Sequence, residues 1–200
     1  CDHLKTLTLP ESLVSIGNSA FADCPVLTEI LLPSGLATIG ANSFEGCACV
    51  KELHIRSDLS LTQYAIVSPF TESGIERIVV EDGVTRLPAN LFSESCPELS
   101  EVVLPSSLRN IESGCFYDCP KLSRLVIRSN VGIENTSTTL SSFENCGLTA
   151  VTFTNGTTEI GRLRLSNKEG ETLTVYLPDS IQQIDSRAFA EFCGTNQTGQ

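Results

Sequence analysis

Short apolar segments recur along the chain at intervals of 23 to 26 residues. The first reads Leu4-x-x-Leu7-x-Leu9-Pro10, and the same arrangement returns at residues 27–33 and 99–105. Alternation of apolar and polar positions predicts a short strand with one buried face, and the proline ends strand pairing because it has no N–H. The eight segments begin at Leu4, Leu27, Val50, Ile75, Leu99, Leu122, Leu148 and Thr172.

The rest of each repeat carries a second apolar pair, such as Leu36 and Ile39, and then a phenylalanine. The phenylalanines are Phe21, Phe44, Phe70, Phe92, Phe116, Phe143 and Phe189. The positions three or four residues later are Cys24, Cys47, Ser73, Cys96, Cys119, Cys146 and Cys193. A single coil cannot bury its apolar side alone, so identical positions should stack about 4.8 Å apart into ladders. Small residues such as Gly40 and Asn42 should let the chain turn into a short helical turn at the phenylalanine.

Nine cysteines in 200 residues would indicate disulfides in many secreted proteins, but here most of them occupy the ladder position. Stacked Cβ vectors point the same way, which is poor geometry for a disulfide. We therefore expect reduced, buried thiols. Cys1 precedes Leu4 by the three residues that separate Cys24 from Leu27, so the chain is expected to begin within a coil.

A longer period is superimposed on the repeat. The loop sequence Leu-Pro-Ser-Gly, which begins at residue 32, recurs as Leu-Pro-Ser-Ser at residue 104 and as Leu-Pro-Asp-Ser at residue 177. The offsets are 72 and 73 residues. In the same way, the segment Phe70-Thr-Glu-Ser-Gly is equivalent to Phe143-Glu-Asn-Cys-Gly. Ser73 therefore occupies a position of the cysteine ladder. A block of three coils therefore looks duplicated.

The segment from Leu27 to Cys47 resembles the BspA-type leucine-rich repeat. It reads Leu-x-x-Ile-x-Leu-Pro-x-x-Leu-x-x-Ile-Gly-x-x-Ser-Phe-x-x-Cys. The resemblance implies a right-handed repeat solenoid, with a parallel β-sheet on one face and short strands, turns and helical turns on the others. Residues 1–200 would form one leucine-rich-repeat domain of about eight coils, truncated at its N-terminus. Departures from the pattern are Arg56 and Arg128 in place of proline, and residues 163–171, which lack the Phe element.

Candidate catalytic and metal-binding groups are few. The two histidines, His3 and His54, lie in different repeats, so no nucleophile and base assemble from them; His54 is expected to be a surface or ligand-contact residue. Cys47-x-Cys49 lacks the spacing of a structural zinc site, and we interpret Cys47 as a ladder member with Cys49 facing the other way. Glu81 lies on a turn and is expected to be solvated. We therefore expect no enzyme activity, no bound metal and no cofactor.

Charge and hydropathy exclude two classes of partner. The formal net charge of −11 repels phosphate, and the 13 basic residues form no run, so nucleic acid is not expected to bind. The longest apolar runs are a few residues, against the roughly 20 needed to cross a bilayer, so no membrane insertion of this segment is expected.

The positions on either side of the central strand residue should point away from the core and are free to contact a ligand. The candidate protein-binding residues in these two columns are Glu29, Leu31, Glu52, His54, Arg77, Val79, Glu101, Val103, Arg124, Val126 and Tyr176. The second column, from Leu31 to Tyr176, is more apolar than exposed strand positions usually are. Either it forms a contact surface, or its valines reflect only the preference of β-branched residues for sheets.

The family resemblance implies a cell-surface or secreted adhesion module that binds a protein, such as a host matrix or surface protein, without catalysis. Two alternatives remain open. The chain could be a stiff spacer that presents another domain of a longer protein, or it could belong to an enzyme whose active site lies outside these residues. Fold alone does not decide between them.

Overall fold

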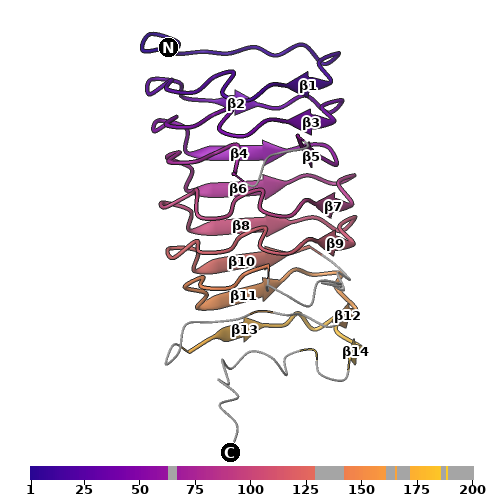
Figure 1. The fold of residues 1–200 in the computed structure, drawn as a ribbon. Helices are drawn as coiled ribbons and strands as arrows, with labels where there is room; N and C mark the ends of the chain where they lie inside the picture. Colours follow the sequence, from indigo (N-terminus) through magenta and orange to yellow (C-terminus); the bar gives the residue numbers. More distant parts are fainter. Residues whose placement is uncertain (63–66, 129–141, 161–164, 166–171, 186–187, 189–200) are drawn as a thin grey trace, which may run out of the picture.

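The computed structural model describes residues 1–62, 67–128, 142–160, 165, 172–185 and 188, and the chain winds into a stack of parallel coils (Figure 1). One seven-stranded parallel sheet runs along the stack in the order β13-β11-β10-β8-β6-β4-β2. Its strands are β2 (Ile30–Leu31), β4 (Glu52–Ile55), β6 (Arg77–Val80), β8 (Glu101–Leu104), β10 (Arg124–Ile127), β11 (Ala150–Phe153) and β13 (Thr174–Tyr176). The repeat solenoid predicted from the sequence is confirmed.

A second side of the stack carries two-residue strands that also pair in parallel (Figure 1). They form three small groups, β1-β3-β5, β7-β9 and β12-β14. These strands are β1 (Ser15–Ile16), β3 (Thr38–Ile39), β5 (Ser60–Leu61), β7 (Arg86–Leu87), β9 (Asn110–Ile111), β12 (Glu159–Ile160) and β14 (Gln183–Ile184). They coincide with the second apolar pair of each repeat.

The register of the large sheet places equivalent repeat positions side by side. Leu125, for example, lies between Val102 on β8 and Val151 on β11, and all three side chains are fully buried. Because alternate residues of a strand point to opposite faces, this register sends one set of side chains into the core and the other set to the outer face of the sheet.

The phenylalanines form a continuous ladder through the core. Consecutive rings from Phe21 to Phe143 stack with centroid separations of 5.1 to 5.9 Å and interplanar angles of 8 to 21°. Phe21 is half-buried and the next five rings are fully buried. The predicted ladder is therefore confirmed over six coils, while Phe189 and Cys193 lie outside the described residues.

The segment around each phenylalanine is a turn and not the expected helical turn, and no helix occurs among the described residues. Left-handed residues stand two positions before and after Phe21, Phe44, Phe92 and Phe116, as with Asn42 (φ 55°) and Gly46 (φ 68°) around Phe44. A left-handed residue interrupts a right-handed helix. It also turns the N–H groups toward the next coil, so Phe44 N–H donates to the Pro69 carbonyl at 2.8 Å and Gly46 N–H to the Thr71 carbonyl at 2.9 Å.

The cysteine ladder lies beside the rings and forms no disulfide among the described residues. Its members Cys24, Cys47, Cys96, Cys119 and Cys146 are buried, and Ser73 occupies the ladder with its hydroxyl 3.6 Å from the Cys96 sulfur. The Cys47 thiol donates to the carbonyl of Phe21 in the preceding coil at 3.5 Å, and the Cys146 thiol donates likewise to the Phe116 carbonyl at 3.1 Å. Cysteine therefore acts as a small apolar filler with a weak donor. Cys49 is exposed, whereas Cys47 is buried.

The longer three-coil period also recurs in the contacts. The Gly83 N–H donates to the Ser107 hydroxyl at 2.9 Å, and 73 residues later the Gly156 N–H donates to the Ser180 hydroxyl at 3.2 Å. Both glycines have positive φ angles, 103° and 96°. Each serine hydroxyl then donates to the carbonyl of the residue after the glycine, at 2.8 and 2.7 Å.

Truncating a buried ring should destabilise the fold strongly. Phe116→Ala should lower the free energy of unfolding by about 3 to 5 kcal/mol, because the rings on either side are held by their own coils and cannot refill the space. Thr6→Ala, at an exposed position of the first repeat, is the control and should change it little. Denaturant titrations of both variants measure the effect, and equal midpoints would contradict the inward and outward assignment.

The ladder thiols should be unreactive until the chain unfolds. Burial raises the pKa of Cys47 and that of Cys96 to about 11, from an ordinary value of 9.0. A thiol whose pKa is higher in the folded chain stabilises the fold below pH 9 and loses that contribution as the pH rises to about 11. Stability should therefore fall over that interval.

The test uses a variant in which Cys1, Cys49 and Cys193 are replaced by serine, which leaves six of the nine cysteines: the five ladder members and Cys115, which is also fully buried. At about pH 8, a thiol-specific reagent should label none of the six in the native protein and all six in denaturant without reductant. Rapid labelling of the native protein, or fewer than six reactive thiols after denaturation, would show that the ladder is not made of buried free thiols.

Candidate functional site

The outer face of the large sheet carries two rows of side chains, and each strand contributes one residue to each row. The charged row holds the first outward position of each strand, and the second row holds the position two residues later. The charged row is Glu29, Glu52, Arg77, Glu101, Arg124, Ala150 and Thr174. The second row is Leu31, His54, Val79, Val103, Val126, Thr152 and Tyr176. The structure thus places the eleven predicted site residues on one face.

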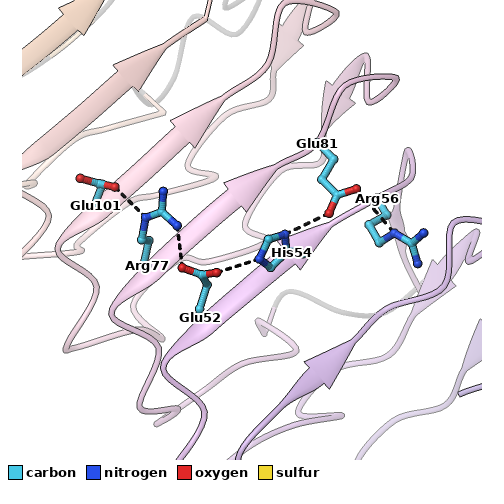
Figure 2. Close-up of polar contacts among 6 residues, drawn as sticks. All are labelled: Glu52, His54, Arg56, Arg77, Glu81 and Glu101. Carbon is cyan, nitrogen blue, oxygen red and sulfur yellow. Dashed lines mark hydrogen bonds and ion pairs between the residues drawn. The ribbon is translucent and has the colours of Figure 1, made fainter. Parts of the chain in front are cut away.

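Opposite charges alternate along the middle of the charged row (Figure 2). The Arg77 guanidinium lies 2.6 Å from Glu52 on one side and 2.7 Å from Glu101 on the other. The second oxygen of Glu101 lies 3.3 Å from Nε of Arg124. Hydrogen bonds from Arg77 and then from His54 lower the pKa of the Glu52 carboxyl. The row is therefore a chain of mutually paired charges.

His54 extends this chain into the second row, where its two ring nitrogens face two carboxylates (Figure 2). Nε2 lies 2.8 Å from Glu52 and Nδ1 lies 2.9 Å from Glu81. Arg56 then bridges Glu81 at 3.6 Å and Glu11 at 3.0 Å. Glu81 is therefore paired and not simply solvated, which corrects the expectation from its place on a turn. Neither nitrogen of His54 is left free to act on a substrate.

The second row departs from the continuous exposed apolar column expected from the sequence. Val79 is 7% exposed and Val103 is 2% exposed, so these two predicted contact residues are buried. Valine is short, and the two lie side by side in the register, between His54 and Val126. Leu31 at 48% and Tyr176 at 55% are well exposed, while His54 and Val126 are half-buried.

Beyond Arg124 the face is hollowed. An open depression of about 480 Å³ is lined by Arg124, Ala150, Thr152 and Tyr176. It arises because β11 offers only the small side chains Ala150 and Thr152 between Arg124 on β10 and Tyr176 on β13. The sequence identified Arg124 and Tyr176 as candidate site residues but did not predict the hollow. The small residue Ala150, in a row of mostly charged positions, could have indicated it.

The described residues supply no group of three or more His, Cys, Asp or Glu side chains placed to hold a metal ion. Within the same residues, no helix has the length and apolar character needed to span a bilayer. The face therefore offers groups suited to contact with another molecule. Paired charges extend over β4 to β10, and a guanidinium, hydroxyl groups and an aromatic ring surround the hollow.

Comparison with known proteins identifies the repeat. The family model for the BspA type leucine rich repeat region matches residues 1–95 and 129–197 in six copies. The crystal structure of a leucine-rich repeat protein from Bacteroides ovatus is similar at 22% sequence identity and a TM-score of 0.38, over 96% of this chain. The chain spans 59% of the length of that protein. No curated protein sequence matches it significantly. Because the family model covers more than half of its residues, the chain belongs to the BspA-type leucine-rich-repeat family.

Proposed function

We propose that the chain is a protein-binding module that recognises its partner through the outer face of the large sheet. The observation that carries this proposal is the hollow at the β10 to β13 end, where Tyr176 and Arg124 are exposed on an otherwise ion-paired face. Leucine-rich repeats commonly bind proteins, and membership of this family supports the same reading.

The distribution of paired and exposed side chains favours this end of the face. A partner that docked over β4 to β8 would have to compete with the ion pairs of Arg77 and cover valines that are already buried. At the hollow, by contrast, it would gain the exposed surface of Tyr176. Tyrosine buries a large area at small entropic cost and is enriched among the residues that dominate binding energy.

The setting we propose is the cell surface or the extracellular space, with a host matrix or surface protein as the partner. Membership of the family supports this location. In such a setting the module would act in adhesion. Other parts of a longer protein could carry further activities, including catalysis.

A stiff spacer is the second candidate, and a specific observation favours it. Ion pairs and the two hydrogen bonds of His54 connect Glu11 to Arg124 through six intervening residues, and stacked rings connect the same coils in the core. Such connections between successive coils resist bending. The spacer function predicts that the chain by itself binds no protein.

The test is a binding screen of the purified chain against extracellular matrix and cell-surface proteins. For a ligand it finds, Tyr176→Ala should weaken binding by about 30-fold, equivalent to about 2 kcal/mol. Tyr117→Ala removes the same side chain at a half-buried position of a phenylalanine turn, away from the sheet, and is the matched control.

Leu31→Glu is a second probe of the face, since Leu31 is exposed, whereas Val103→Glu would bury a charge and unfold the chain. Unchanged affinity for both Tyr176→Ala and Leu31→Glu, with folding intact, would move the binding site off the sheet. The absence of any ligand would favour the spacer.

A further inference from the structure

The alternation of charges along the charged row stops at a cation. Glu101 is shared between two arginines, at 2.7 Å from Arg77 and at 3.3 Å from Arg124. On the other side of Arg124 the register places Ala150, followed by Thr174, so no carboxylate follows in the row. The Arg124 side chain is 58% exposed, and its terminal nitrogens have no partner among the described residues. Of the two arginines in the row, Arg124 is therefore the less satisfied, because Arg77 is paired with a carboxylate on each side.

Among the described residues, the outward positions of β10, β11 and β13 also carry no acidic side chain, although the chain has a net charge of −11. The outward positions of β10, β11 and β13 are Arg124, Val126, Ala150, Thr152, Thr174 and Tyr176. The next outward residue after β10 is Arg128, which is exposed. The outer face thus carries a local positive patch, although carboxylates are abundant on the rest of that face. The patch is complementary to an anionic group.

The hollow has the dimensions of a side-chain site. Arg124 and Tyr176 form its walls on strands two steps apart, a separation of roughly 9.6 Å, and the methyl groups of Ala150 and Thr152 form its floor. A guanidinium presents parallel N–H donors that match the two oxygens of a carboxylate. The tyrosine ring offers an apolar surface and the threonine a hydroxyl group.

We propose that this hollow binds an acidic segment of a partner protein, with an aspartate or glutamate carboxylate on Arg124 and a neighbouring apolar side chain against Tyr176. The proposal rests on the protein-binding function proposed above and specifies the chemistry of the partner. A carboxylate-bearing peptide fits better than a phosphate polymer, because β4 to β8 beside the hollow carry Glu52, Glu81 and Glu101, which would repel further phosphates.

The decisive variant is Ala150→Glu, since residue 150 lies directly beside Arg124 in the register. A glutamate there continues the alternation of charges, pairs with the guanidinium and fills the floor of the hollow, while the fold should remain at least as stable. Thr6→Glu is the matched control: it makes the same charge change at the equivalent position of the first repeat, where the side chain is exposed.

The probe is a random peptide library displayed on phage and selected on the wild-type chain. Selected peptides should contain an aspartate or glutamate next to an apolar residue, and replacing that acid by its amide should weaken binding by at least about tenfold. Ala150→Glu should cause a similar loss and Thr6→Glu should not. Thermal melting of both variants establishes that they are folded.

Two results would overturn the proposal: no enrichment of acidic peptides, or acidic peptides that bind Ala150→Glu as tightly as the parent. If neutral peptides are enriched and Tyr176→Ala abolishes their binding, the protein-binding function stands and the acidic partner is wrong. If neither Tyr176→Ala nor Ala150→Glu affects binding, the binding site proposed for the sheet face fails together with this inference.

Discussion

The structure depends on one constraint, which is that each coil must present the same kind of side chain at the same place to the next coil. Parallel strands repeat about every 4.8 Å, so any side chain in the stack meets its own equivalent above and below. Rings tolerate this by stacking, and thiols by donating to a carbonyl of the preceding coil. Backbone contacts are equally strict: a Cβ on Gly74 would overlap the carbonyl oxygen of Ala48, so only glycine fits there.

The outer face obeys the same constraint with charges in place of apolar groups. Like charges directly opposite each other in a sheet are destabilising, so a column of ionisable residues persists only if its signs alternate. Glu52, Arg77, Glu101 and Arg124 alternate in this way and are joined by ion pairs. The exception in the described row is Glu29, which precedes β2 and has no ion pair with the described residues, while its neighbour Glu52 pairs with Arg77 on the other side. We therefore propose that a partner docks where the alternation ends, beside the small residues of β11.

Sequence alone predicted the features that follow from periodicity: the inward positions, both ladders, the place of Ser73 and the two outward rows. It did not predict features that depend on the size of neighbouring side chains. Val103, which lies between Val79 and Val126 in the register, is buried although its position points outward, and the hollow exists because Ala150 is small. The pairing of His54 with Glu81 joins positions 27 residues apart and at different places in their repeats, which a comparison of equivalent positions does not reveal. Similarly, the turn at each phenylalanine depends on left-handed residues. Several of them, such as Glu94, are not glycine, so their conformation could not be recognised from the sequence.

The most direct test of this account is the solvent exchange of the arginine Nε–H groups, followed by nuclear magnetic resonance without any ligand. The Nε–H of Arg77, bonded to Glu101 at 2.7 Å, should exchange slowly, whereas that of Arg124, at 3.3 Å from the same carboxylate, should exchange fast. Ala150→Glu should then slow the exchange of Arg124 and leave that of Arg77 unchanged. Equal exchange rates for the two arginines in the parent chain would contradict the claim that the row is satisfied from Glu52 to Glu101 and open at Arg124.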